Sequence, residues 1–591
     1  MMEKRITLFI ILTILIFIGF QYFFPPASRP VPAERTGQIE YPDAAPTDAG
    51  SPSTAVENNI QSSASQTHTM SPISHVEDVE NEDTKATAQR IVIDGDLYTA
   101  VLDNRGGVLT SWELKDYQTK KRNKNEHGRV FDMISGASRN GGLYPGALVL
   151  PDDAATATLN NEYYQVAIEG AELSDEVILL PPVSVKLTLT RGDLIIEKIW
   201  SFEKDNYTAN LSINGTKAGK PLEGRFFLGE DIGPQSEHFT SNAANLVSVY
   251  FSGGKVRRES PPKNPQEPKR LDGDMRWIGL DMQYFSIIAI PKYPLNWFSI
   301  QTIHDFQTGL DGNELERNLL RVMLPFDTSG FGAGTDYTLY IGPKKQENLR
   351  RTGAADLSGV IDYGMFSLIV YPLLAALRWI YQFVQNYGAA IVVLTFVISL
   401  VLFPLRLKSM LSMRKMSAVQ PKVKAIQEKY KQYKVTDPRK KEMNQEIMAL
   451  YKTHGVNPMG GCLPLLIQMP LLIAFYSLLA YTIDLRQAPF IWWIQDLSAK
   501  DPFYVLPVAM GLTSFISQKM MPMSPSVDPT QAKVMMIMPI FFTFIFLNMS
   551  SGLNLYFLCS NVFQVALQKI AERWIPNNPP PQAVVKAKSK K

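Results

Sequence analysis

Residues 389–405 read AAIVVLTFVISLVLFPL, and this stretch decides the class of fold. It carries no charge, and an apolar helix of about 20 residues crosses the hydrocarbon core of a bilayer. Arg406 and Lys408 follow directly, and Arg414 and Lys415 come shortly afterwards. Since Lys and Arg are retained on the cytoplasmic side of a membrane, this end of the span is predicted to face the cytoplasm.

Four further apolar spans follow toward the C-terminus, at about 461–482, 503–521, 533–549 and 552–573. Between Arg406 and Lys452, thirteen Lys or Arg residues face only four acids, and apolar side chains recur there at helical spacing. This basic stretch, residues 408–455, is predicted to be a cytoplasmic helical hairpin. Residues 389–575 are therefore predicted to form a five-helix transmembrane bundle, and residues 576–591 a basic cytoplasmic tail.

A sixth apolar run, residues 6–24, follows Lys4 and Arg5. It is either a signal peptide or a retained anchor. Aromatic residues end it, and Pro25-Pro26 stands where a signal peptide has a small-x-small cleavage site. These features favour a retained N-terminal transmembrane anchor, residues 1–25, with both chain termini in the cytoplasm and the following residues outside it.

Between the anchor and the bundle the composition changes twice. Residues 26–88 are rich in Pro, Ser, Thr and Ala and poor in large apolar side chains, which predicts a disordered tether. Residues 89–345 contain short β-prone runs separated by turn signals, which predicts an antiparallel β-sandwich. The clearest runs are 90–93, 97–102, 183–189, 194–202, 284–290 and 337–341.

Residues 346–388 are predicted to be a linker and an interfacial amphipathic helix, because Pro372, Arg378 and several aromatics interrupt residues 363–385. The predicted fold class is thus a multi-domain membrane protein. It has an N-terminal transmembrane helix, an outer antiparallel β-sandwich, and a C-terminal five-helix transmembrane bundle with a cytoplasmic helical hairpin.

Uncharged polar residues lie in the inner halves of three bundle spans, where a rise of about 1.5 Å per residue puts them at a similar depth. They are Thr395, Ser399, Gln468, Asn561, Gln564 and Gln568. Such residues are costly in lipid unless they face water or a polar substrate, so the pattern predicts a groove that is wet from the inside and closed from the outside. The alternative is that they only bond one helix to another.

Catalytic signals are weak. The chain has no phosphate-binding glycine motif and no metal-ligand spacing, and its six His are scattered, so we predict no catalytic residue, no cofactor and no metal. Two other hypotheses stay open at this point. A solute transporter predicts charged or ion-coordinating groups near the midplane and internal repeats, and the sequence shows neither. A carbohydrate-active enzyme would need a His and carboxylate pair in a cleft of the sheet.

The basic hairpin and tail orient the chain whatever its function. They also suit contact with anionic lipids or with the RNA-rich surface of a ribosome.

Three segments closely resemble the YidC membrane protein insertases of Gram-negative bacteria, within the YidC/Oxa/Alb family. They are VNPMGGCLPLLIQMP at 456–470, LRQAPF at 485–490 and SGLNLY at 551–556. The resemblance implies an inner-membrane insertase and chaperone that acts on nascent membrane proteins, alone or with Sec translocon components. It also implies that the outer domain is a periplasmic β-supersandwich and that the groove opens to the cytoplasm and lipid.

The resemblance places four residues of this chain in that groove: Thr395, Gln468, Tyr556 and Gln568. One position departs from the family, because Ser399 stands where its members generally have Arg or Lys, five residues before Pro404. Arg406 lies seven residues further along, close to the same helix face but about 10 Å nearer the cytoplasm. Arg406 is therefore either a basic groove residue or an interfacial anchor.

Overall fold

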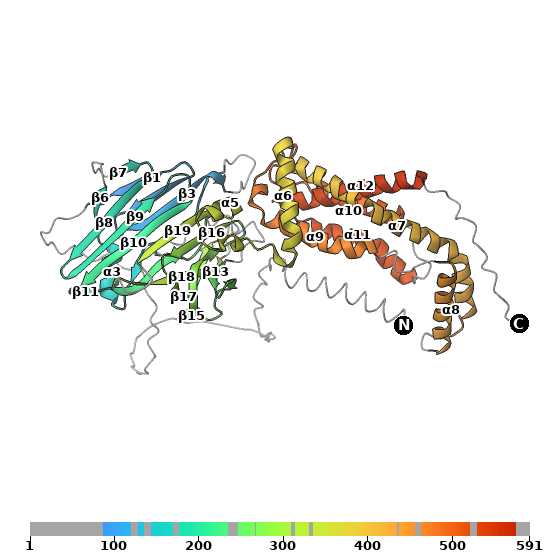
Figure 1. The fold of residues 1–591 in the computed structure, drawn as a ribbon, viewed down its shortest axis with the longest axis horizontal. Coiled ribbons are helices and arrows are strands. Elements are labelled where there is room, and N and C mark those ends of the chain that lie inside the picture. Colours follow the sequence, from blue (N-terminus) through green and yellow to red (C-terminus); the bar gives the residue numbers. More distant parts are fainter. Residues whose placement is uncertain are drawn as a thin grey trace, which may run out of the picture.

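The computed structural model describes residues 87–119, 128–134, 143–168, 176–233, 246–265, 267–308, 314–329, 335–433, 437–455, 463–520 and 529–574. A β-sandwich lies at one end of an elongated molecule and a helical bundle at the other, with helix α6 at their junction (Figure 1). The predicted N-terminal anchor, nearly all of the tether and the basic tail lie outside the described residues.

Two sheets make up the sandwich. The smaller has five strands in the order β4-β3-β2-β1-β7, and the larger has the path β5-β12-β18-β17-β15-β16-β19-β10-β9-β8-β6, with β11 on β10, β13 on β15 and β14 on β13. The strands are β1 (Arg90–Asp94), β2 (Tyr98–Asp103), β3 (Val108–Gln118), β4 (Val130–Asp132), β5 (Leu148–Val149), β6 (Gln165–Ile168), β7 (Glu176–Leu179), β8 (Val183–Arg191), β9 (Leu194–Phe202), β10 (Thr208–Lys217), β11 (Lys220–Pro221), β12 (Glu223–Gly229), β13 (Val247–Ser252), β14 (Lys255–Glu259), β15 (Lys269–Asp281), β16 (Phe285–Pro291), β17 (Leu295–Thr308), β18 (Glu314–Asp327) and β19 (Asp336–Pro343).

The β-prone runs of the sequence all lie on strands, and β9 begins and ends at the predicted residues. Alternate side chains of β9 point into the core, as expected for a strand with one buried face. The prediction of an entirely antiparallel sandwich is wrong at one edge, because β1 pairs with β7 in parallel. The two strands are separated by most of the smaller sheet and by helix α3 (Asp153–Asn161), and a connection this long can return a strand in either direction.

A short connector links the sandwich to the bundle. It contains α5 (Gln346–Arg351), the 3₁₀ turns η1 (Leu357–Val360) and η2 (Gly364–Phe366), and α6 (Ser367–Val384). Helix α6 runs across the near end of the bundle (Figure 1), and it packs against both α7 and α9.

The bundle contains α7 (Tyr387–Lys429), α8 (Arg439–Thr453), α9 (Leu463–Tyr481), α10 (Val505–Met520), α11 (Pro529–Phe546) and α12 (Ser551–Trp574), with the 3₁₀ turn η4 (Ile483–Leu485) after α9. Helix α7 is longer than the predicted span 389–405, because it continues through Pro404 and Pro421 to Lys429, into the predicted hairpin. A proline removes only one helical hydrogen bond, and packing of the following turns against α8 keeps the helix intact.

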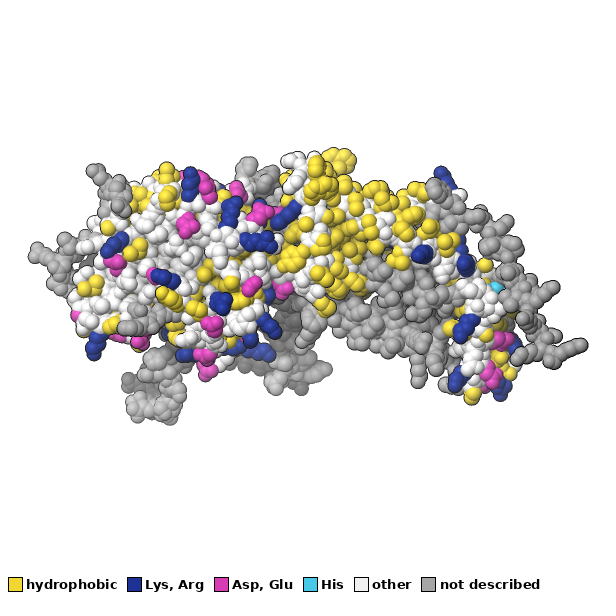
Figure 2. All heavy atoms as spheres, viewed as in Figure 1, with side chains coloured by type: hydrophobic (Ala, Val, Ile, Leu, Met, Phe, Trp, Pro, Cys, Tyr) yellow, Lys and Arg dark blue, Asp and Glu magenta, His cyan; other side chains and the backbone are white. Residues whose placement is uncertain are grey.

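The surface of the bundle differs from that of the sandwich. Hydrophobic side chains gather over the helices, and charged side chains gather over the sandwich and around α8 (Figure 2). By length and composition, Gly364–Val384 and Tyr387–Lys429 could each cross a membrane, while Gln468–Tyr481 and Met536–Phe546 are shorter apolar helices. Leu368, Val401 and Phe544 are among the exposed apolar residues, which is the pattern expected where lipid replaces water.

Candidate functional site

Three of the sequence-predicted site residues meet inside the bundle. Arg406 on α7 donates from Nη2 to Oε1 of Gln468 on α9 over 3.0 Å. The Nε2 of Gln468 donates in turn to the hydroxyl of Tyr556 on α12 over 3.2 Å. We call these residues the Arg406–Gln468–Tyr556 cluster. It joins three helices through polar groups in an otherwise apolar region.

Packing holds the tyrosine of this cluster in place. Tyr556 is buried, and its ring stacks on Phe475 of α9 with centroids 4.0 Å apart and planes 14° apart. Phe475 lies seven residues after Gln468, two helical turns along the same face of α9. One face of α9 therefore contacts Tyr556 twice, once by stacking and once by a hydrogen bond.

Arg406 keeps an unused donor. Its Nη1 atom is buried and has no hydrogen-bond partner among the residues that the structure describes. No carboxylate is paired with it in the described part of the bundle. A guanidinium inside a membrane protein is costly unless it faces water, a partner or a substrate, so Arg406 marks a place where a polar group can enter.

Thr395 and Ser399 lie further out on the same helix and are enclosed by the bundle. They are 1% and 2% exposed, and the Thr395 hydroxyl donates to the backbone oxygen of Ile391, one turn earlier. Ser399 and Arg406 are seven residues apart on a continuous helix, so they share a face. The cation therefore lies about 10 Å along α7 from Ser399.

The polar residues of α12 contact two neighbouring helices, α10 and α9. Asn561 donates from Nδ2 to the Ser514 hydroxyl of α10 over 2.6 Å, and Gln568 donates to the backbone oxygen of Met520 at the end of α10. Gln564 is partly exposed between them. The polar stripe of α12 thus contacts α10, whereas Tyr556 one turn earlier contacts α9.

Two residues in this arrangement carried little signal in the sequence. Ser514 is a single hydroxyl in an apolar span, and Phe475 is one of many aromatics. Only the contacts with Asn561 and Tyr556 distinguish them. Among the described residues, no three His, Cys, Asp or Glu side chains are grouped so that they could hold a metal ion.

The fold and the site together define a class of protein. It is a membrane protein with a large sandwich outside the apolar band and with a cation held by uncharged polar groups inside the helical bundle. Two family models match the chain: the YidC periplasmic domain over residues 90–376 and the 60Kd inner membrane protein over residues 379–578.

Relatives cover nearly the whole chain. The membrane protein insertase YidC of Geotalea daltonii is 33% identical over 590 residues, which is 97% of this chain and 100% of that protein. The membrane protein insertase YidC of Syntrophus aciditrophicus is 32% identical over 580 residues, or 96% and 99% of the two chains. The chain belongs to the YidC family of membrane protein insertases. It is an inner-membrane protein with a periplasmic domain, as the two family models describe.

Solved structures are more distant. An active YidC insertase with its first transmembrane domain resolved is 19% identical, with a TM-score of 0.33, over 82% of this chain and 93% of its own. A putative aldose 1-epimerase from Escherichia coli K12 is 10% identical, with a TM-score of 0.22, over 44% of this chain and 100% of its own. The family assignment rests on the sequence matches.

Proposed function

We propose that this insertase receives the hydrophilic part of a nascent membrane protein in a groove that opens to the cytoplasm and to lipid. The groove residues are Thr395, Ser399, Gln468, Tyr556, Asn561, Gln564 and Gln568, with Arg406 as its cation. Thr395, Ser399 and Tyr556 are buried in the structure, whereas the other four are partly exposed. The protein acts as an insertase and chaperone for inner-membrane proteins. It performs no covalent chemistry and uses no cofactor.

The observation that carries this proposal is the Arg406–Gln468–Tyr556 cluster. Arg406 has one buried unused donor and is held through Gln468, which is hydrogen-bonded in turn to Tyr556. Its guanidinium can therefore exchange hydrogen bonds with a passing peptide without breaking an ion pair. Ser399 lies near the middle of the span 389–405 and carries no charge. Arg406 lies on the same face of α7, nearer the cytoplasmic end of the span, and carries the positive charge instead. This placement supports a groove residue over an interfacial anchor, because Arg406 donates inward to α9.

The driving force comes from the client. A polar segment that enters the groove crosses less hydrocarbon than it would in an undisturbed bilayer, and the apolar segment beside it moves into lipid. Burial of about 20 apolar residues is strongly favourable, so insertion needs no nucleotide.

The topology that fits this mechanism has α7, α9, α10, α11 and α12 crossing the membrane and α6 lying at the outer interface. Together with the N-terminal anchor, this places both termini in the cytoplasm and the sandwich in the periplasm. The band of hydrophobic side chains over the bundle supports it, and so do the basic residues of α8 at the far end (Figure 2).

Partners follow from the same surfaces. Nascent membrane proteins are the clients, and Sec translocon components are partners for the larger ones. The basic side chains around α8 and the basic tail suit anionic lipids and the ribosome, because both are negatively charged.

Crosslinking tests the groove. A stalled nascent client is presented to variants that carry a photoreactive residue at Thr395, Ser399, Gln468 or Gln564, and Leu512, exposed on the apolar surface of α10, is the matched control. We expect the polar segment of the client to crosslink at the four inner sites and not at Leu512. Crosslinking at Leu512 alone would contradict the groove.

A further inference from the structure

The loop that follows α9 reaches into the periplasmic sandwich. Arg486 of this loop is only 7% exposed, and its guanidinium lies 5.2 Å from the ring centroids of both Phe131 and Phe285. The two rings stack on each other at 4.2 Å, and Tyr117 meets Phe285 edge-on at 5.6 Å. A cation close to an aromatic ring is attracted by the ring quadrupole, and more strongly where water is excluded.

Hydrogen bonds on both sides of Arg486 reinforce this contact. Gln487 donates from Nε2 to the backbone oxygen of Gln118 in the sandwich over 2.7 Å. In the opposite direction, Gln283 of the sandwich donates to the backbone oxygen of Ala480, in the last turn of α9, over 2.6 Å. The outer end of α9 is thus held by residues far away in the sequence.

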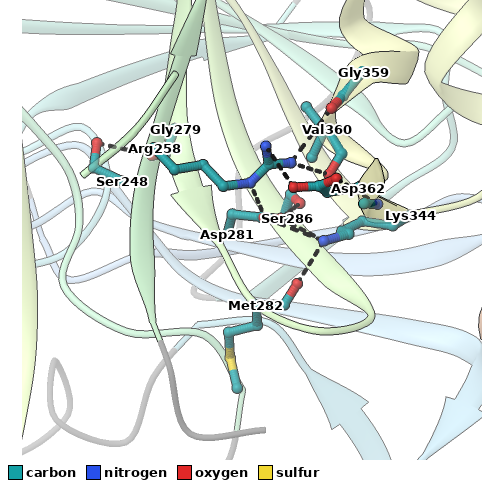
Figure 3. Close-up of polar contacts among 11 residues, drawn as sticks. Ser248, Arg258, Gly279, Asp281, Met282, Ser286, Lys344, Gly359, Val360 and Asp362 are labelled. Atoms are coloured by element: carbon teal, nitrogen blue, oxygen red, sulfur yellow. Dashed lines mark hydrogen bonds and ion pairs between the residues drawn. The ribbon is translucent and has the colours of Figure 1, made fainter. Parts of the chain in front are cut away.

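The covalent connection between the domains is also stiffened. Arg258 of β14 donates to the backbone oxygen of Val360 over 2.9 Å and forms an ion pair with Asp362 at 3.3 Å (Figure 3). Arg258 therefore binds the connector directly to the sandwich. Lys344, at the start of the connector, pairs with Asp281 of β15 at 2.9 Å. Both members of this pair are buried, and Ser286 donates a further hydrogen bond to Asp281 (Figure 3).

An ion pair closes the ring of contacts. Arg378 of α6 meets Asp484 of the same loop at 2.8 Å, two residues before Arg486. The sandwich therefore contacts the connector, the connector continues into α6, α6 is paired with the loop, and the loop is inserted into the sandwich. A domain attached at one point can swivel freely, whereas each further separated attachment restricts its rotation.

We propose that the sandwich, the connector, α6 and the outer end of α9 form one rigid body, and that Arg486 is the latch that completes it. The recess formed by Phe131, Phe285 and Tyr117 is the receptor for this latch. The sandwich is then held at a fixed orientation to the membrane bundle. This inference does not depend on the proposed groove.

Distance measurement between paired spin labels tests the latch in the full chain in lipid nanodiscs. The two cysteines are replaced by serine, and labels are placed at exposed Lys220 on β11 and exposed Lys500 in the loop. We expect one narrow distance distribution for the parent protein and one at least about twofold wider for Arg486→Ala. The matched control is Arg270→Ala, because Arg270 also lies over an aromatic ring, Trp297, at 4.4 Å, but belongs wholly to the sandwich. The control should keep the narrow distribution.

A second label pair, Lys220 and Lys255, lies within the sandwich and reports whether that domain stays folded. If this pair also widens in Arg486→Ala, then Arg486→Met, which keeps an unbranched apolar stem beside the rings, replaces it. An interdomain distribution that stays narrow in the folded variant overturns the proposal. Equal widening in Arg270→Ala overturns the assignment to Arg486.

Discussion

At the residue scale, Arg406 shows how one side chain depends on its helix neighbours. It lies two residues after Pro404, on a helix that continues to Lys429, and its Nη2 atom donates to Gln468. The sequence allowed this residue to be a surface anchor or a groove cation. The hydrogen bond to Gln468 favours the groove, because an interfacial anchor would extend its guanidinium toward lipid headgroups.

The first prediction concerns this cation. Arg406→Ala should lower the insertion rate of a client with an acidic periplasmic segment by roughly tenfold, since a hydrogen bond to a charged group is worth about 1.5 kcal/mol or more. The insertion rate of Arg406→Lys should lie between those of the parent protein and Arg406→Ala, because lysine keeps the positive charge but lacks the several N–H donors of the guanidinium. Protease protection of the client in proteoliposomes measures the rate. Lys408→Ala, which removes an exposed cation from the same helix, is the control, and an equal loss there would contradict the role of Arg406.

A second prediction concerns Lys198, which lies on the inward face of β9 with its side chain fully buried. Its Nζ donates to the backbone oxygens of Gly106 at 2.6 Å and Gly146 at 2.7 Å. Burial lowers the pKa of Lys198 to about 7. In the unfolded chain the pKa returns to its ordinary value near 10.5, so between these values the unfolded state binds the additional proton.

The free energy of unfolding of the sandwich should therefore rise as the pH increases from 7 to 9, by on the order of 2–3 kcal/mol. Lys198→Met should remove this rise. Burial raises the pKa of Tyr164 beside it, so this tyrosine stays neutral over the whole range and does not contribute. Denaturant unfolding of the full chain, followed by tryptophan fluorescence, measures the effect. An unchanged slope in Lys198→Met would exclude Lys198 as the cause.

At the element scale, α12 is the helix that joins the two sides of the bundle. It stacks Tyr556 on α9 and hydrogen-bonds Asn561 and Gln568 to α10. Helix α11 packs closely on α10, where a Cβ on Gly511 would come within 2.0 Å of the Thr543 hydroxyl. The α10–α11 pair is held to α12 through α10, by packing between the two helices and by the hydrogen bonds of Asn561 and Gln568.

A third prediction follows for this helix pair. Asn561→Ala and Ser514→Ala should each destabilise the bundle, and the double variant should cost less than the sum. The expected coupling energy is about 0.6 kcal/mol, typical of side-chain hydrogen bonds between membrane helices. Unfolding in mixed micelles measures it. Gln564→Ala with Ser514→Ala is the control cycle and should show additive effects; coupling of the same size there would argue against a specific Asn561–Ser514 bond.

At the scale of the whole molecule, the buried apolar side chains of the sandwich, the connector and the bundle form one continuous cluster. The loop after α9 and the connector join the two parts. The polar and aromatic contacts at this junction involve main-chain oxygens on both sides, Gln118 in the sandwich and Ala480 in α9. The bundle nevertheless contains every residue of the proposed groove.

The fourth prediction separates the two parts. Deletion of about residues 60–340 should leave insertion of small client proteins largely intact, because the groove residues all remain. The bundle should become less heat-stable, because Arg486 and Gln487 lose their partners in the sandwich. Client insertion and the midpoint of thermal unfolding are measured side by side at equal membrane content. Loss of all activity at normal membrane content would instead favour a function in the sandwich.

The sequence by itself determined the order of parts: a β-rich domain, an interfacial segment and a set of apolar helices, because hydrophobic length and strand alternation are local properties. It also identified Gln468 and Asn561 as unusual, since polar groups in apolar spans are visible without a structure, whereas Tyr556 was singled out only by the family resemblance. Only the tertiary structure decided which of them meet. It joined Arg406 to Gln468 and Gln468 to Tyr556, turned Asn561 toward Ser514, and placed Lys198 in a core and Arg486 beside two stacked aromatic rings. These partners are tens to hundreds of residues apart in the chain, and no local pattern encodes a contact that depends on how separate helices and strands pack.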